Sequence, residues 1–260
     1  MWWHDYLPSR LFLSFGPINI YYYGLIIAIA ILIAVFYAQK SSKNKLNIKK
    51  EQANELFFYL VLFAIIGARF YHVLFFNWSY YRYHFLEVFQ IWQGGLAIQG
   101  AILAGVFTLL ICAKKYQLKF YQLSDWLVPA LALGQSIGRW GNYFNQELFG
   151  KPLDAWYALQ ISPENRVAGF ENFTYFHPTF FYESILNLVL FLVLYFLTKK
   201  KLPLGTITWL YLGGYFLIRF SLEFVRIDST PLLFGFRLPQ LVSLVVIFFS
   251  LFFIIKRLKK

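Results

Sequence analysis

The chain has 260 residues, of which 59% are hydrophobic and only 14% are charged. Soluble domains carry about one-quarter charged residues, so the composition excludes a soluble protein and indicates an integral membrane protein. The net charge is +12, but the lysines lie in short clusters between apolar runs, which argues against a nucleic-acid partner. No soluble block is long enough for a second domain, so residues 1–260 are expected to form a single polytopic membrane domain.

The N-terminus and the few metal-binding residue types narrow the class further. The first residues lack the basic segment of a cleaved signal peptide, so the first apolar segment is expected to stay in the mature protein. The single cysteine, Cys112, lies inside an apolar run, which is typical of a core residue and provides no disulfide framework. The histidines show no paired ligand spacing. No metal site and no cofactor are therefore expected.

Seven stretches are long and apolar enough for membrane-spanning helices, which need about 20 residues each. The sequence thus predicts an all-α fold with seven transmembrane helices. They are placed at residues 18–37, 56–76, 94–113, 123–140, 179–197, 205–225 and 238–255.

The distribution of basic residues predicts the orientation. Most lysines lie in alternate connections and in the tail, and the positive-inside rule places those segments in the cytoplasm. The N-terminus is then outside and the C-terminus cytoplasmic, which requires an odd number of spans. These basic residues are Lys40, Lys43, Lys45, Lys49, Lys50, Lys114, Lys115, Lys119, Lys199, Lys200, Lys201, Lys256, Arg257, Lys259 and Lys260.

Two connections on the expected outer side are longer than a turn requires. Residues 77–93 are rich in tryptophan and tyrosine, which favours a position at the membrane interface. Residues 141–176 form the longest polar stretch. A connection of that length indicates a small external cap between spans four and five.

The segment from Gly134 to Gly150 is the most informative in the chain. It places Arg139, Asn142 and Glu147 where an apolar helix should end. Charges at membrane depth are costly and usually functional, and the interleaved glycines allow backbone to approach a neighbouring helix or a ligand. The alternative is a helix end with a snorkelling arginine.

A second polar cluster is expected on the sixth span. Tyr215, Arg219, Glu223 and Arg226 follow at spacings of four, four and three residues, which puts them on one helix face. The simplest explanation is an intrahelical Arg–Glu pair that neutralises itself. The same pairing would also hold an arginine fork rigid for an anion. Embedded arginines opening toward the outer leaflet favour an anionic ligand with apolar tails, a phospholipid.

The residues of this segment also carry a family resemblance. The run Gly138-Arg139-x-Gly141-Asn142-x-x-Asn145-x-Glu147-x-x-Gly150 resembles the signature of the bacterial prolipoprotein diacylglyceryl transferases. Further similar positions follow in the family's order over nearly the whole chain. They are Tyr23-Gly24, Gly67-Ala68-Arg69, Gly94-Gly95-Leu96, His177-Pro178, Glu183 and the block 215–226.

The resemblance implies a transferase of the bacterial cytoplasmic (inner) membrane, with its active site toward the outer leaflet. Its substrates would be phosphatidylglycerol and the lipobox cysteine of a prolipoprotein signal peptide. The diacylglyceryl group would move to the thiol, giving a thioether and glycerol phosphate in the first step of lipoprotein maturation. Preorganised guanidinium groups stabilise the charge that develops on such a leaving phosphate.

Site residues follow from the same match. It assigns Arg139 and Arg219 as catalytic, with Arg226 as a further candidate. It suggests that Asn142 orients the glycerol head group or the phosphate, that Glu147 holds an arginine or a backbone amide in the cap, and that Gly150 permits a turn where the cap begins. Residues expected to bind substrate are Arg69, Tyr23, Gln99, Asn142, Glu147, Gly150, Glu223 and Arg226.

One position departs from the family. Where its members commonly carry a histidine, a favoured general base, this chain has Gln99, and an amide accepts no proton near neutral pH. Guanidinium charge lowers a thiol pKa, so we hypothesise that Arg139 and Arg219 favour the thiolate directly while Gln99 positions substrate. His72 is the alternative base.

Three other functions fit the sequence less well than this one. A transporter or flippase for an anionic lipid would use the same arginines, but no internal repeat is visible. A Gly-x-Ser-x-Gly pattern at 134–138 lacks the strand that a hydrolase elbow needs. A scaffold leaves the embedded charge unexplained. The sequence leaves open the base, the lipid entry route, the number of lipid sites and the oligomeric state.

Overall fold

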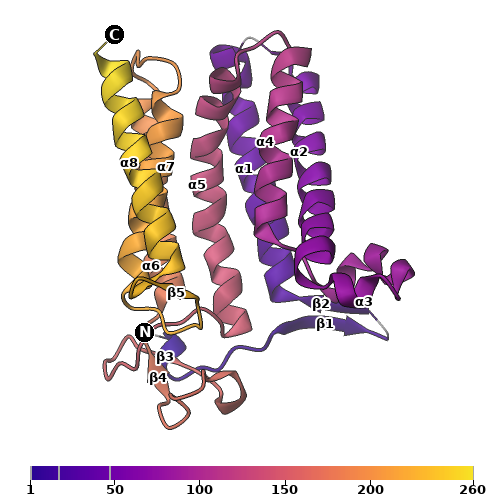
Figure 1. Cartoon of the computed structure of the whole chain (residues 1–260), viewed down its shortest axis with the longest axis vertical. Helices are drawn as coiled ribbons and strands as arrows, with labels where there is room; N and C mark the ends of the chain where they lie inside the picture. The colour runs from indigo at the N-terminus through magenta and orange to yellow at the C-terminus, as the bar shows by residue number, and fades with distance from the viewer. Residues whose placement is uncertain (1, 17, 47, 260) are drawn as a thin grey trace. The chain divides into compact units, whose positions relative to one another are not determined.

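The computed structural model describes residues 2–16, 18–46 and 48–259. It divides into two compact units: unit 1 is Met1–Tyr37 with Leu127–Lys260, and unit 2 is Ala38–Trp126. Long helices make up most of both units, and the strands form short two-stranded antiparallel sheets (Figure 1).

The long helices are α1 (Tyr22–Leu46), α2 (Lys50–Tyr71), α4 (Ile98–Lys115), α5 (Phe120–Asn145), α6 (Thr179–Leu197), α7 (Thr206–Glu223) and α8 (Leu238–Leu258). A π-helical segment, His72–Phe76, continues α2 and leads to the short α3 (Trp78–Tyr81). Single 3-10 turns lie at Trp2–His4, Phe85–Phe89, Ile91–Gln93 and Pro163–Asn165. The strands are β1 (Leu11–Phe15), β2 (Ile18–Tyr21), β3 (Leu159–Gln160), β4 (Tyr175–Phe176), β5 (Leu232–Leu233) and β6 (Phe236–Arg237).

The helix bounds confirm some sequence predictions and correct others. Helix α6 coincides with the predicted stretch 179–197. The predicted first span started too early, because residues 18–21 pair as β2 with β1. The third also started too early, because Gly94 and Gly95 have φ angles of 90° and 71° and α4 begins only at Ile98.

Two predicted helices were too short at their polar ends. Helix α1 continues through Lys40 into the lysine-rich connection, and α5 continues to Asn145. The apolar stretch marks the membrane-crossing part of a helix. In α1, lysine and glutamine are good helix formers that extend the helix beyond its apolar core. The segment predicted as a cap at 141–176 therefore begins after residue 145.

In the part of the chain that the structure describes, five helices are long and apolar enough to cross a membrane: Tyr22–Ser42, Lys50–Phe76, Ile98–Lys115, Thr179–Leu197 and Leu238–Leu258. Large apolar side chains on these helices, such as Leu32, Phe107 and Phe248, are about two-thirds exposed. Exposed apolar surface on that scale requires an apolar environment, so the chain is a mostly helical membrane protein. Among the described long helices, α5 and α7 are less apolar than these five. Helix α5 carries Arg139, and α7 carries Arg219 and Glu223.

The core of unit 1 joins its helices to the segment between α5 and α6. Val128 and Ala132 of α5 pack with Leu194 of α6 and with Ile207 and Tyr211 of α7. Beyond the helix ends, a second core of mostly aromatic side chains holds the β3–β4 hairpin and the N-terminal turn. This second core consists of Trp3, Tyr143, Phe149, Leu159, Ile161, Phe176 and Phe180.

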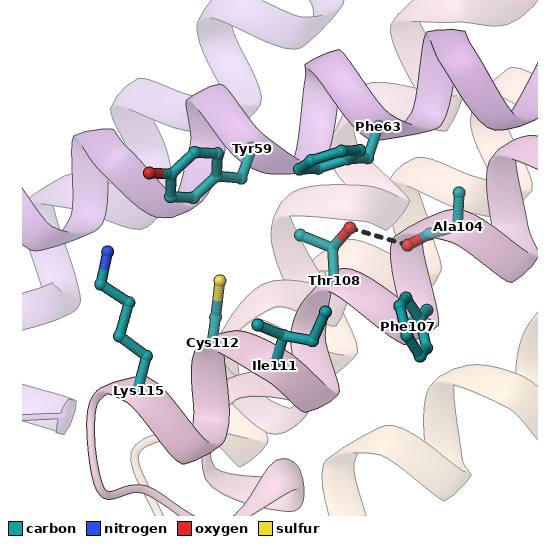
Figure 2. A pocket seen from close by; sticks show the side chains of 8 residues that line it. All are labelled: Tyr59, Phe63, Ala104, Phe107, Thr108, Ile111, Cys112 and Lys115. Atoms are coloured by element: carbon teal, nitrogen blue, oxygen red, sulfur yellow. Dashed lines mark hydrogen bonds between the residues drawn. The ribbon is translucent and has the colours of Figure 1, made fainter.

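Unit 2 is organised by a close crossing of α2 and α4. A Cβ atom at Gly100 would lie 2.1 Å from the carbonyl oxygen of Gly67, so only glycine fits there. Farther along, the two helices leave an apolar groove of about 380 Å³, with Tyr59 and Phe63 facing Thr108 and Ile111 (Figure 2). Cys112 lines this groove and is buried, as expected for a core cysteine.

Candidate functional site

A buried carboxylate joins the two arginines that the sequence singled out. Glu183, in the first turns of α6, has one carboxylate oxygen 2.7 Å from Nη2 of Arg139 on α5. Its other oxygen lies 3.6 Å from Nη1 of Arg219 on α7. The side chain of Glu183 is only 4% exposed. Three helices thus converge on one carboxylate, and Arg139 and Arg219 lie side by side in unit 1 as expected.

A second carboxylate extends the cluster beyond the end of α7. Oε2 of Glu223 lies 3.5 Å from Nη2 of Arg219 and 3.9 Å from Nε of Arg226, and Oε1 lies 3.0 Å from Nε of Arg237. Asp228 pairs with Arg226 at 2.8 Å. The predicted intrahelical pair is present, but Glu223 is shared among three arginines. It is therefore not a self-neutralising pair.

The arginines of this cluster differ in accessibility. The side chains of Arg139 and Arg219 are 22% and 18% exposed, whereas that of Arg226 is 5% exposed. Arg219 meets both of its carboxylates at 3.5 Å or more, beyond the usual length of a charge-assisted hydrogen bond. Arg139 and Arg219 thus retain donor capacity for a ligand, and Arg226 is committed to its neighbours.

Arg226 also corrects the expectation of a single helix face. Helix α7 ends at Glu223, and the backbone at Arg226 forms a bridge with Gly150. Lys151 donates its backbone N–H to the carbonyl of Val225 at 2.8 Å. The N–H groups of Val225 and Arg226 still donate to the carbonyl of Leu222, whereas the Val225 carbonyl is paired with the extended segment that contains Lys151. Tyr215, Arg219 and Glu223 remain on the helix.

A chain of hydrogen bonds leads from Arg139 through Asn142 to Glu147. Nη1 of Arg139 donates to Oδ1 of Asn142 at 3.2 Å, and Nδ2 of Asn142 donates to Glu147 at 2.7 Å. Asn145 donates to the same Glu147 oxygen at 3.3 Å. Because both ends of the buried Asn142 amide are used, Asn142 orients the arginine. Glu147 holds side-chain amides here, where an arginine or a cap amide was expected.

Tyr23 and the glycines of α5 complete this face of unit 1. A Cβ atom at Gly141 would lie 2.8 Å from the Tyr23 ring, and one at Gly138 would lie 3.3 Å from Ile27. The glycines therefore let α5 approach α1, as the sequence suggested. The Tyr23 hydroxyl lies within electrostatic reach of Glu147 and Arg139.

Gly150 has a different role from the expected turn. A Cβ atom there would lie 2.7 Å from Val225 and 2.8 Å from His177. The positive φ angles at the start of this segment belong to Gln146 and Leu148 instead. Gly150 is therefore needed for close packing between the end of α7 and the residues before α6.

Substituting Gly150 by alanine is expected to destabilise the protein by about 1–3 kcal/mol, the usual cost of overpacking. The measurement is the thermal unfolding midpoint in detergent. Gly105→Ala is the matched control, since no atom lies within 4 Å of its added Cβ. A Gly150→Ala midpoint equal to that of the control would contradict the packing role.

The remaining predicted residues belong to unit 2. Arg69 is buried and donates to four backbone carbonyls, those of Glu87, Val88, Gly94 and Gly95. This arrangement fixes the aromatic segment after α2 and gives Arg69 a structural role. Gln99 is exposed in the first turn of α4, and His72 contacts the Asn77 amide at 3.2 Å. Substrate binding by Arg69 and Gln99 stays a prediction.

Comparisons with known proteins place the chain in a family. The family model for prolipoprotein diacylglyceryl transferase matches residues 10–256. The chain belongs to the prolipoprotein diacylglyceryl transferase family. This confirms the predicted family and enzyme class.

Several named relatives align with most of the chain. It is 43% identical over 243 residues to the phosphatidylglycerol–prolipoprotein diacylglyceryl transferase of Trichormus variabilis, covering 91% of this chain and 85% of the relative. The enzyme of the same name from Synechococcus elongatus is 41% identical over 249 residues, covering 94% and 85%. That of Halalkalibacterium halodurans is 38% identical over 241 residues, covering 92% and 83%.

Sequence reasoning underestimated two residues of this family member. Glu183 was noted only as a family match, although it links Arg139 to Arg219. Arg237 was not among the residues predicted for the site, although it lies 3.0 Å from Glu223. An acidic residue inside the apolar run 179–197 was a usable signal, because buried carboxylates are normally paired. Arg237 gave no comparable signal, since it precedes α8 at a position typical of a loop.

His177 has a structural place beside Gly150. Its carbonyl accepts the Gly150 N–H at 3.0 Å, and its ring contacts the Tyr182 hydroxyl at 3.1 Å. Burial, together with the positive charge of Lys151, lowers the pKa of His177 below its ordinary value. An imidazole that packs against Gly150 and contacts the Tyr182 hydroxyl has a structural role here.

Proposed function

We propose that this chain transfers the diacylglyceryl group of phosphatidylglycerol to the lipobox cysteine thiol of a prolipoprotein. The thiol sulfur forms a bond to the glyceryl carbon, and the bond from that carbon to the phosphate oxygen breaks. Glycerol phosphate leaves with the electron pair of that bond, and the thiol proton is released to water. The observation that carries this proposal is the partly accessible pair Arg139 and Arg219, held by the buried Glu183.

The charge balance of the cluster supports a phosphate ligand. The ion pairs join four arginines, Arg139, Arg219, Arg226 and Arg237, to the carboxylates of Glu183, Glu223 and Asp228. One positive charge is left over within this ion-paired set, which matches the single charge of a phosphodiester. As the bond to the leaving phosphate breaks, a second negative charge develops. Preorganised guanidinium groups of low exposure stabilise that charge more strongly than the ground state.

The membrane arrangement belongs to the same proposal. All seven long helices span the cytoplasmic membrane as one domain, with the N-terminus outside and the segment after α5 as an external cap. Helices α5 and α7 are less apolar because they carry the site. The arginine cluster then lies toward the outer leaflet, where phosphatidylglycerol and the signal peptide with its lipobox cysteine reach it.

The test is transfer of label from phosphatidylglycerol labelled in its glyceryl group to a lipobox peptide by the purified protein. Label on the peptide that requires its cysteine supports the proposal, and a peptide with alanine in place of the cysteine is the control. Movement of the lipid between leaflets without label on the peptide would indicate a transporter instead.

The thiol proton gives a separate prediction. Because nearby guanidinium charge favours the thiolate, His72→Ala is expected to keep transfer within about tenfold of wild type, less than the usual contribution of a general base. The measurement is the initial rate at equal protein level. Abolished transfer with normal folding would assign the base to His72.

A further inference from the structure

Arg237 is the most heavily engaged arginine among the described side chains of unit 1. It ends the β5–β6 hairpin, directly before α8. Its Nε donates to Thr230 at 2.8 Å, and its Nη1 donates to the carbonyls of Glu223 and Arg226. Its Nη2 donates to the carbonyl of Asp228. This residue cannot turn toward a ligand without losing these bonds.

The guanidinium also acts on a site carboxylate. Nε lies 3.0 Å from Oε1 of Glu223, while the Nε proton itself is directed to Thr230. Oε1 has no hydrogen-bond donor in the structure. The attraction between Arg237 and Glu223 is therefore one of charge in a setting where the Glu223 side chain is 1% exposed. Charges interact more strongly there than in water.

The other oxygen of Glu223 faces Arg219 at 3.5 Å. A carboxylate with no competing cation forms a short, bidentate pair with an arginine fork. We propose that Arg237 is a positioning residue for the transfer reaction: its charge holds the Glu223 carboxylate back from Arg219, so that the Arg219 fork stays available for the lipid phosphate. This inference rests on the proposed function.

Loss of the Arg237 charge has a defined consequence. The Glu223 carboxylate is then shared by Arg219 and Arg226 alone, and it rotates to pair closely with Arg219. The phosphate must compete with that pair. Arg237→Gln is expected to lower kcat/KM for phosphatidylglycerol by about tenfold, the scale of coupling within one salt-bridge network. Inhibition by glycerol phosphate is expected to weaken in parallel.

Arg237→Lys distinguishes two roles of Arg237: positioning Glu223 by charge, and holding the β5–β6 hairpin by hydrogen bonds. Lysine keeps the charge near Glu223 but loses the fork that binds the carbonyls of residues 226 and 228. The proposal expects Arg237→Lys to keep most of the transfer that Arg237→Gln loses. Equal losses of transfer in the two variants would show that Arg237 acts only by holding the hairpin, and would overturn the proposal. Arg82→Gln, an exposed arginine in unit 2, is the control.

The double variant keeps the test decisive if Arg237→Gln alone does not fold. With Glu223→Gln, the carboxylate that Arg237 is proposed to hold back from Arg219 is gone, and only the more distant Asp228 carboxylate, 3.8 Å from Nη2, remains beside Arg237. Adding Arg237→Gln to Glu223→Gln is therefore expected to change kcat/KM by less than about twofold, because the coupling is absent. A further tenfold loss would overturn the proposal. Wild-type transfer is measured in the same series, and its absence would instead reject the proposed function.

Discussion

Arg139→Lys is expected to lower the rate of diacylglyceryl transfer by about 100-fold or more, the usual effect of removing a preorganised donor from a developing oxyanion. Arg139 contacts Glu183 with one terminal nitrogen and Asn142 with the other. A lysine has a single nitrogen and cannot occupy both positions while facing a phosphate. The substitution keeps the charge, so a large loss reports the fork geometry.

The measurement is kcat/KM for labelled phosphatidylglycerol with a saturating lipobox peptide. Arg10→Lys is the matched control, because Arg10 is an exposed arginine of unit 1 that hydrogen-bonds Asn165. The thermal unfolding midpoints of both variants are expected to stay near that of wild type. Full transfer by Arg139→Lys would remove the role assigned to Arg139.

Five of the long helices were predictable because their apolar runs are long enough to span a membrane. The bounds of α6 match the stretch 179–197, in which apolar residues predominate from Phe180 to Leu197. Helix ends in polar sequence were not predictable in the same way. Lys40 lies within α1, and Asn145 ends α5. Hydropathy locates the part of a helix in lipid, and hydrogen bonding decides where the helix ends.

The candidate site was predictable at its centre and not at its edge. Arg139 and Arg219 stand out because a charge inside an apolar run is rare, and the structure places both against Glu183. Arg69 stands out for the same reason, yet it binds four carbonyls of its own unit. The sequence therefore shows that a charge is embedded, but only the structure shows which groups pair with it.

The partners of α7 show the same limit. Glu223 was predicted to pair along its own helix, and Arg219 is indeed four residues away at 3.5 Å. The shorter contact, 3.0 Å, comes from Arg237, which is 14 residues farther along the chain. A helical spacing rule finds neighbours on one helix. That rule does not predict contacts from a hairpin that folds back onto the helix end.

Glu183→Gln is expected to have the second large effect, because it removes the charge that both accessible arginines share. A glutamine amide leaves Arg139 without a carboxylate partner, and Arg219 then has only Glu223 as a counter-ion. Breaking a buried ion pair from one side costs on the order of 3 kcal/mol, and the partial exposure of the two arginines reduces this figure. Transfer is expected to fall by about 100-fold, since the two forks lose their common orientation.

Both thermal unfolding and kcat/KM are measured for this variant, with Glu164→Gln as the control for an exposed carboxylate. Glu183→Asp refines the test, because the shorter side chain keeps the charge but reaches only one of the two arginines. Its rate is expected to lie between those of wild type and Glu183→Gln. If Glu183→Gln transferred lipid at the wild-type rate, Arg139 and Arg219 would not need a shared carboxylate, and the pair would act through the lipid phosphate alone.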